Sequence, residues 1–159
     1  MPTRAPRTKI ADAKQDASLE FCIRLARAHA VLTRRLDNRL SSLHGLGFGD
    51  FMLLNFLSRA EGQRLRRIDL ADRMGMTASG VTRSLLPLEK IGRVSRQADP
   101  RDARVGFALL TPAGAQLLGH ARVAAEAICR EAVEQVPGEQ LDALLGILGQ
   151  LAGINLTNA

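Results

Sequence analysis

"RIDLADRMGMTASGVTRSLLPLEKIGRV", residues 67–94, is the stretch of the sequence that decides the fold. Apolar residues at helical spacing predict a short first helix that ends at Met74, and Gly75 and Met76 then form a tight turn. Thr77 is a hydroxyl residue of the kind that caps helix N-termini, so a second helix is expected to begin directly after it. The stretch therefore predicts two short helices joined by a tight turn.

The second helix has two chemically different faces. Val81, Leu85 and Leu88 are spaced four and three residues apart, which predicts that this face packs into the core. The opposite face carries small, hydroxyl, arginine and leucine side chains: Ala78, Ser79, Thr82, Arg83 and Leu86. A helix that lies against base edges in the major groove needs small and hydrogen-bonding side chains on its outer face. The pattern is typical of a helix-turn-helix.

Pro87 lies inside this second helix. It removes the backbone hydrogen bond to the carbonyl of Arg83, so we expect a kink or an early helix end there. Gly92 occupies the position after a helix C-terminus where glycine is favoured.

A charged hairpin is predicted directly after the helix pair. Val94–Gln97 and Val105–Leu110 are expected to form two antiparallel strands, and the loop between them contains the turn signal Asp99-Pro100 and two arginines, Arg101 and Arg104. A helix-turn-helix followed by a hairpin predicts a winged helix. The hairpin arginines are expected to reach the minor groove, whose negative potential attracts guanidinium groups.

The N-terminal part is predicted to be an arm followed by a long helix. Residues 1–17 are basic and lack a hydrophobic period, which favours a flexible arm, and Ser18 is a plausible cap for a helix that extends to Leu43. That helix has two rows of apolar residues, and a chain of this size has few other elements to cover both. A second copy of the chain is therefore expected to cover one of them. After three glycines, Asp50 is a possible cap for the next helix.

The C-terminal part is predicted to contain two helices. Thr111 and Pro112 are a cap and a first-turn proline, and the long helix that they begin is broken at 137–138. We therefore expect a mostly α-helical fold with a small β-hairpin wing, divided into a helical dimerisation region (18–46 and 112–153) and a winged helix-turn-helix (47–111).

The composition favours a polyanion partner. The net charge is +6, and residues 59–104 carry eleven basic against six acidic side chains. No stretch is apolar and long enough to span a bilayer, and no secretory signal is visible, so a cytoplasmic location is expected. The three histidines lie far apart without carboxylate partners at metal spacing, which predicts neither a catalytic centre, nor a metal site, nor a cofactor.

Two segments resemble the MarR family of bacterial transcriptional regulators: "MTASGVTRSLLPLEKIGRVSR" and "DPRDARVGFALLTPAG". The resemblance extends from about Leu19 to Leu151 and implies a homodimeric winged-helix regulator, typically a repressor, on a pseudo-palindromic operator. By position, Thr82 and Arg83 would contact the major groove, Ser79 a phosphate or base, and Arg104 the minor groove with Asp102 bracing it. Ala103 departs from the family pattern, which often has a second arginine there. The DNA-binding residues that the pattern and the resemblance together predict are Thr77, Ser79, Thr82, Arg83, Arg101, Asp102 and Arg104.

The resemblance also implies a small aromatic acid or phenol as an effector, bound between the dimerisation helices and the winged helix. Cations beside apolar side chains occur at Arg34, Arg35, His44, Phe48 and Phe51. The competing interpretation of each is a surface arginine or a core phenylalanine.

Two alternative functions follow from other features. Cys22 lies in the first helix, where a peroxide-sensing subgroup of the family has its reactive thiol, although the tyrosines that activate that thiol are missing here. A winged-helix protein-interaction module without DNA binding is the other alternative, and such a module has no need to keep Thr82, Arg83, Arg101 and Arg104 together.

Overall fold

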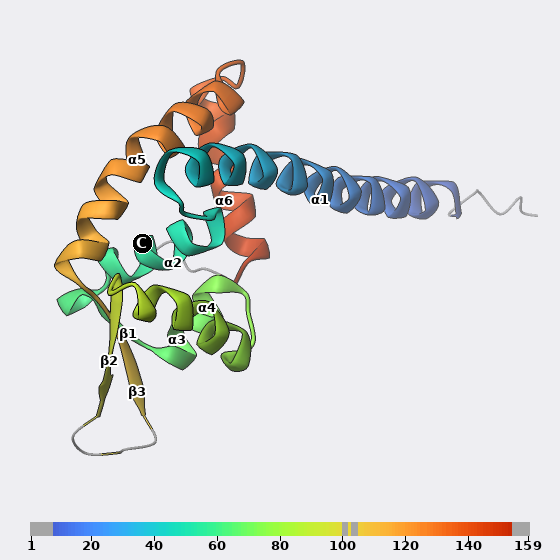
Figure 1. The fold of residues 1–159 in the computed structure, drawn as a ribbon. Coiled ribbons are helices and arrows are strands. Elements are labelled where there is room, and N and C mark those ends of the chain that lie inside the picture. Colours follow the sequence, from blue (N-terminus) through green and yellow to red (C-terminus); the bar gives the residue numbers. More distant parts are fainter. Residues whose placement is uncertain (1–7, 100–101, 103–104, 154–159) are drawn as a thin grey trace, which may run out of the picture.

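The computed structural model describes residues 8–99, 102 and 105–153, with side chains from Ala17 onward (Figure 1). Helices dominate the described chain, and a small three-stranded sheet extends from one end of it, which confirms the predicted fold class. The elements in chain order are α1 (Thr8–His44), α2 (Phe48–Arg59), the 3-10 turn η1 (Glu61–Gln63), β1 (Arg64–Arg66), α3 (Arg67–Met74), α4 (Ala78–Lys90), β2 (Val94–Ala98), β3 (Gly106–Leu110), α5 (Pro112–Val133) and α6 (Gly138–Leu151).

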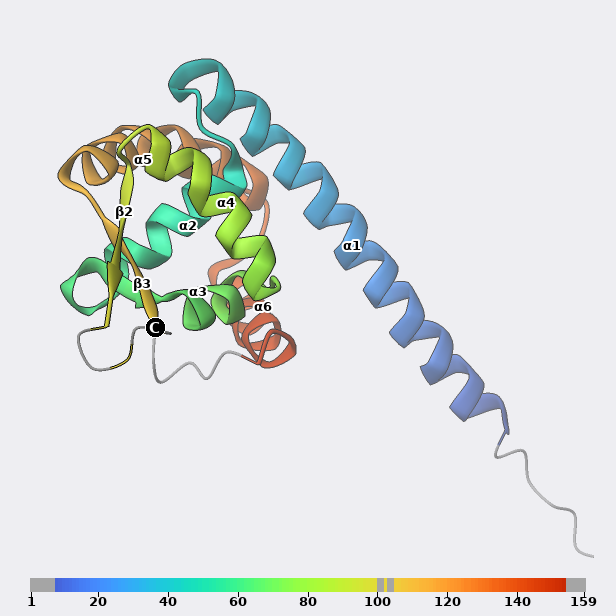
Figure 2. The same cartoon turned by 60° about the horizontal axis from the view of Figure 1, so that its bottom comes forward.

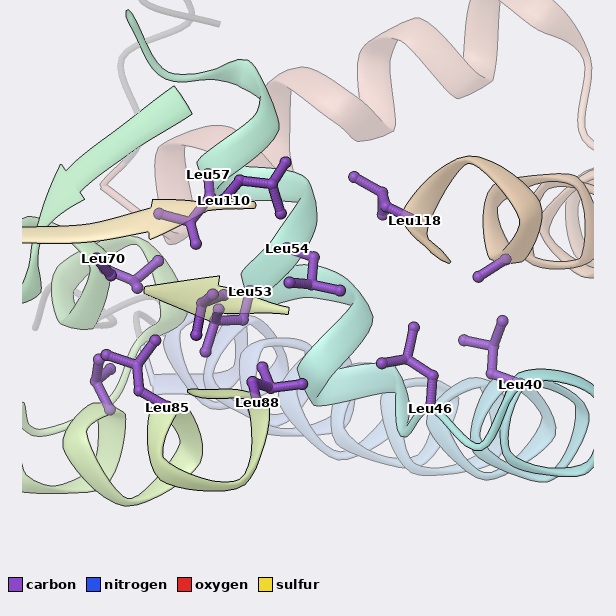
Figure 3. Packing of buried hydrophobic residues seen from close by; sticks show 14 of the residues in the cluster. Leu40, Leu46, Leu53, Leu54, Leu57, Leu70, Leu85, Leu88, Leu110 and Leu118 are labelled. Carbon is purple, nitrogen blue, oxygen red and sulfur yellow. The ribbon is translucent and has the colours of Figure 1, made fainter. Parts of the chain in front are cut away.

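Leucines from six elements form the core around α2 (Figure 3). Leu53, Leu54 and Leu57 of α2 are completely buried, and α2 contacts α1, α3, α5 and β3. With no tryptophan or tyrosine in the chain, this density of leucine supplies the apolar area that stabilises the fold. The core therefore joins the predicted helix-turn-helix to the long helices α1 and α5.

The sheet has the antiparallel strand order β1-β3-β2. In its register Val94 is opposite Leu110, and both are buried. The predicted hairpin strands are confirmed to within one residue at their ends. The third strand, β1, pairs Leu65 with Ala108 and closes the inner edge of the hairpin.

The start of α1 differs from the prediction. The helix begins at Thr8, so residues 8–17, which were predicted to be a flexible arm, are helical. This segment has three alanines and two lysines and contains neither glycine nor proline, so nothing in it ends the helix before Ser18. Residues 1–7 of the predicted arm lie outside the described residues.

Only the C-terminal part of α1 packs against the body of the molecule. Leu36 and Leu40 are completely buried there, and α1 contacts α5 and α2. The preceding turns project away from the body in both views (Figures 1 and 2). Leu19 and Ile23 on these turns are 64% and 52% exposed.

The start of α2 corrects another expectation. The N-cap residue is Gly47, which has no side-chain oxygen, and Asp50 lies in the first turn, where it accepts a hydrogen bond from the Gly47 backbone. The Phe48 N–H donates to Asp37 Oδ1 at 2.6 Å, so a carboxylate from α1 satisfies this helix end. Burial raises the pKa of the Asp50 carboxyl, a hydrogen bond from the Gly47 backbone lowers it, and the negative charge of Asp37 raises it further.

The last helix, α6, makes few contacts with the rest of the described chain. Gly149 is its single buried residue, whereas five large apolar side chains are exposed: Leu144, Leu145, Ile147, Leu148 and Leu151.

Candidate nucleic-acid interface

Helix α4 begins at a sharp, well-satisfied turn. Gly75 ends α3 with a left-handed backbone at φ +62°, a conformation that favours glycine. The Met76 N–H donates to the Ala71 carbonyl at 2.9 Å. Thr77 caps α4 as predicted, because its hydroxyl oxygen accepts a hydrogen bond from the Gly80 N–H at 3.1 Å.

The two predicted faces of α4 are present in the structure. One face is buried through Val81, Leu85 and Leu88, which fixes the rotation of the helix about its axis. Ala78, Ser79, Arg83 and Leu86 are exposed and Thr82 is half-buried, on the other face. We call Ser79, Thr82, Arg83 and Leu86 the outer face of α4.

Internal hydrogen bonds determine what the outer face offers to a ligand. The Thr82 hydroxyl donates to the Ala78 carbonyl at 3.0 Å, so its oxygen keeps only acceptor capacity and its methyl group. The Thr77 oxygen is occupied by the cap and lies 3.2 Å from the Ser79 hydroxyl. Within the part of the chain that the structure describes, the Arg83 guanidinium has no hydrogen-bond or ion-pair partner. Its five N–H donors are available to a guanine edge or a phosphate.

Pro87 does not end α4. The helix continues to Lys90, so the expected early end is wrong. Proline removes only the single bond to the Arg83 carbonyl, whereas Leu88, one residue further on, is almost fully buried and holds the last turn in place.

The wing is formed by β2, β3 and the loop that joins them (Figure 1). Where the loop begins, just beyond the last strand pair of Ala98 and Gly106, the Asp99 N–H donates to the Val105 carbonyl, and the Val105 N–H donates to the Asp102 carbonyl, both at 2.9 Å. Asp102 is half-buried. Arg101 and Arg104 lie outside the described residues, so their predicted roles stay predictions.

Side chains tie the wing to its neighbours on both faces. On the inner face Arg96 of β2 forms an ion pair with Glu89 of α4. On the opposite face of the sheet, Arg64 of β1 lies 5.0 Å from the centre of the Phe107 ring on β3 and donates a hydrogen bond to Gln97 on β2. The wing is thereby held against α4 and β1.

Two more arginines lie beside β3, at the end of the strand that adjoins the loop. Arg66 forms a bidentate ion pair with Asp69, at 2.7 and 2.8 Å, and these hydrogen bonds to Asp69 raise the pKa of Arg66. The Arg67 guanidinium lies over Gly106, where a Cβ atom would come within 2.6 Å of Arg67 Nη2. Gly106 therefore lets a cation lie directly on the backbone of the wing.

The five residues predicted to hold an effector are only partly brought together. The rings of Phe48 and Phe51 stack with their centres 6.2 Å apart. Arg35 instead forms a 3.0 Å ion pair with Glu131 of α5 and lines a shallow pocket of about 550 Å³ between α1 and α5. Arg34 is exposed and His44 is half-buried.

A larger open pocket of about 1350 Å³ lies between α2, β1, α3, β3 and the end of α6. Sequence reasoning missed it, because it is assembled from elements far apart in the chain and β1 has only three residues. Its lining is a mixture of cations, acids and apolar side chains, and the cations among them are Arg59, Arg64, Arg66 and Arg73.

Neither cysteine is in a disulfide, and both are exposed. Burial of part of its side chain raises the pKa of the Cys129 thiol, and the charge of Glu126 raises it further. A raised pKa lowers the thiolate fraction and with it the reactivity.

Among the described residues, no group of three or more histidine, cysteine, aspartate or glutamate side chains could hold a metal ion. None of the described helices is both long and apolar enough to cross a membrane.

Comparison with known proteins points to one family. The MarR family model matches residues 44–105, which contain the helix-turn-helix and the first part of the wing. The transcriptional regulator MhqR of Bacillus subtilis, of the helix-turn-helix type, is 30% identical over 103 residues, which are 65% of this chain and 69% of MhqR.

Solved structures share the fold over most of the chain. Sco3205, a MarR family transcriptional regulator from Streptomyces coelicolor solved in complex with DNA, is 29% identical with a TM-score of 0.78, over 84% of this chain and 88% of that one. NadR, solved in complex with 4-hydroxyphenylacetate, is 24% identical with a TM-score of 0.71, over 98% of this chain and 100% of that one, and this likeness shows the fold alone. The capped helix α4, which we call the recognition helix, and the braced wing agree with these relatives. The chain belongs to the MarR family and is a winged-helix, DNA-binding transcription regulator.

Proposed function

We propose that the chain acts in the cytoplasm as a homodimeric repressor that binds a pseudo-palindromic operator and is released by a small aromatic acid or phenol. The observation that carries this proposal is the outer face of α4. Among the described residues, the Arg83 guanidinium on this face has no partner, and hydroxyl groups and an exposed leucine lie beside it, while the opposite face is buried in the core. Arg83 would contact a guanine edge or a phosphate, and Ser79, Thr82 and Leu86 the neighbouring base edges.

The wing would supply the second contact. Arg101 and Arg104 are carried by the loop between β2 and β3, and Asp102 would brace Arg104. The ion pair of Arg96 with Glu89 supports a fixed angle between the wing and α4, so both elements would reach one DNA duplex at once.

Exposed apolar surface supports the homodimer. The projecting turns of α1 expose Leu19 and Ile23, and α6 exposes five large apolar side chains while making few contacts with the other described residues. Soluble monomers seldom expose contiguous apolar surface of this extent. A two-fold copy of the chain would cover both helices and would place two recognition helices on one operator.

The effector is the least constrained part of the proposal. The stacked Phe48 and Phe51 rings supply an apolar wall, and Arg34, Arg35 and His44 supply cations for a carboxylate. Arg35 would have to leave Glu131 to contribute. The shared fold with NadR, which binds 4-hydroxyphenylacetate, supports an aromatic acid as the first class to test.

The competing functions have less support. The thiol-sensor alternative needs an activated cysteine, and the chain has no tyrosine to activate Cys22. A protein-interaction module has no need for an exposed Arg83 beside hydroxyl groups. We also propose that the chain has no catalytic activity, since its relatives are regulators.

The test is selection of bound duplexes from a random library, followed by titration of the enriched duplex and light scattering of the protein. We expect a pseudo-palindromic sequence, which we call the selected operator, bound by two subunits with a steep salt dependence. A monomer in solution, or equal binding to the selected and a scrambled duplex, would contradict the proposal. A thermal-shift screen in which no aromatic carboxylate or phenol stabilises the protein would remove the effector from it.

A further inference from the structure

The C-terminal end of α4 is fastened to the N-terminal end of α5. The Thr111 hydroxyl lies 2.7 Å from the Gly92 carbonyl and 3.0 Å from the Arg93 carbonyl, and it donates its one proton to these two oxygens. The Thr111 N–H also donates to the Arg93 carbonyl, at 3.2 Å. In return, Arg93 Nη1 donates to the Ala113 carbonyl at 3.1 Å.

The same threonine caps α5. Its oxygen accepts a hydrogen bond from the Gly114 N–H at 3.0 Å. One side chain therefore closes the end of the recognition helix and begins the next long helix. We call these contacts the α4–α5 junction, made by Gly92, Arg93, Thr111, Ala113 and Gly114.

The chain turns directly after α4, so that the carbonyls of Gly92 and Arg93 face Thr111. Gly92 has a left-handed backbone at φ +69°, and its N–H donates to the Glu89 carbonyl at 3.0 Å. The Arg93 N–H donates to the Leu88 carbonyl at 2.8 Å. This pair of bonds reverses the chain just after α4 and leaves the Gly92 and Arg93 carbonyls free to accept from Thr111.

Gly114 brings the two backbones into contact. It is buried, and a Cβ atom at this position would lie 2.0 Å from the Arg93 carbonyl oxygen and 2.9 Å from Leu110 Cδ1. Any side chain here would push the start of α5 away from the end of α4. Gly119, in the same helix, is exposed, and a Cβ atom there would meet nothing within 4 Å.

A change of angle at this junction would be magnified along α5. The helix has 22 residues, a length of about 33 Å at about 1.5 Å per residue. A tilt of about 10° at one end would displace the other end by about 6 Å, close to two base-pair steps of about 3.4 Å. Because α5 packs on α1 and leads to α6, this displacement would change the distance between recognition helices in a dimer.

We propose that Thr111 and Gly114 are positioning residues that set the angle between α4 and α5, and thereby the half-site spacing that the dimer accepts. This inference rests on the proposed homodimer and palindromic operator. It assigns no DNA contact to either residue: both act through the placement of the recognition helix.

Two matched pairs of variants test the proposal. Thr111→Val keeps the shape of the side chain but removes the hydroxyl, whereas Thr111→Ser keeps the hydroxyl. Gly114→Ala adds the clashing methyl group, whereas Gly119→Ala adds the same methyl group in open space. Each variant is titrated by fluorescence anisotropy against the selected operator, an isolated half-site, and operators with one base pair inserted or removed between half-sites.

We expect Thr111→Val and Gly114→Ala to lower the affinity for the full operator about tenfold or more, because the second half-site no longer fits. The affinity for the isolated half-site should fall about twofold or less. Their discrimination against altered spacing should also shrink, while Thr111→Ser and Gly119→Ala match the wild type. Equal fractional losses on operator and half-site, or unchanged spacing preference, would overturn the inference. If Gly114→Ala does not fold, the titrations of Thr111→Val alone test the inference.

The failure of the proposed function would look different. In that case the wild-type protein itself would be monomeric, or would bind the half-site as tightly as the full operator. A wild type with a clear spacing preference that Thr111→Val retains would overturn the positioning role alone.

Discussion

Leu86 is the residue on the outer face of α4 whose role can be isolated most sharply. It lies one helical turn after Arg83 and is 50% exposed, although it is a large apolar side chain. Thymine is the base that presents an apolar group, its C5-methyl, in the major groove. We expect Leu86 to pack against the methyl group of one thymine in each half-site.

The expected magnitude follows from the exposed fraction. Complete burial of a leucine side chain is worth about 1.5–3 kcal/mol, so covering the exposed half is worth about 1 kcal/mol. Because the dimer places one Leu86 in each half-site, Leu86→Ala should cost about 2 kcal/mol and weaken binding to the selected operator about 30-fold. Replacement of the contacted thymine by deoxyuridine removes one methyl group, worth about 0.8 kcal/mol, and should weaken wild-type binding about fourfold.

The assay is a double-mutant cycle by fluorescence anisotropy. Each thymine of the selected operator is replaced by deoxyuridine in turn, and every duplex is titrated with wild type and with Leu86→Ala. At the contacted thymine the penalty for deoxyuridine should disappear in Leu86→Ala. The matched control is Ile91→Ala, because Ile91 is 60% exposed but follows the end of α4. Equal deoxyuridine penalties in both proteins at every thymine, or equal losses for Leu86→Ala and Ile91→Ala, would refute the reasoning.

Three further predictions follow from the site and the fold. Arg104→Ala should weaken binding to the selected operator and to unrelated duplexes by similar factors and lower the salt slope by about one, whereas Arg83→Ala should cost about 1–3 kcal/mol on the selected operator and much less on random DNA. Titrations at several salt concentrations distinguish the two variants, and an unchanged salt slope for Arg104→Ala would contradict the wing assignment. Deletion of residues 139–159 should give aggregates or weakened dimers by light scattering, and a soluble, folded monomer would show that the interface is elsewhere. Because burial and the charge of Asp37 raise the pKa of Asp50, the charged carboxylate destabilises the fold, and Asp50→Asn should resist urea better than the wild type at pH 7. This advantage should fade as the pH falls through the raised pKa toward the unfolded value of 3.8. A difference in stability that does not vary with pH would contradict this cause.

Local signals predicted most of the winged helix. The Thr77 and Thr111 caps and the apolar period of α4 depend on residues within one or two turns, and all of them are confirmed. The exposure of Arg83 follows from the same period, whereas its contact with DNA remains a prediction. Gly92 follows the C-terminal end of α4 as predicted, whereas the early end that was one of the two outcomes expected at Pro87 is wrong, because the burial of Leu88 outweighs a single lost hydrogen bond.

Contacts between distant parts of the chain escaped prediction. The hydrogen-bond acceptor at the start of α2 is Asp37 on another helix, and no spacing rule identifies such an acceptor. The ion pair of Arg35 with Glu131 and the junction at Thr111 likewise join residues whose proximity only the tertiary fold creates. The segment 8–17 was misjudged for a different reason: its polar composition resembles that of a flexible arm, yet its helix propensity is high.

The most direct test of the central claim is methylation interference at guanine N7 on the selected operator, since N7 lies in the major groove where the outer face of α4 would bind. We expect methylated guanines to block binding in two patches related by two-fold symmetry, about one helical turn apart, and we expect Arg83→Ala to lose sensitivity at one guanine in each patch. Binding that is indifferent to N7 methylation throughout the selected operator would contradict the claim that α4 contacts DNA in the major groove.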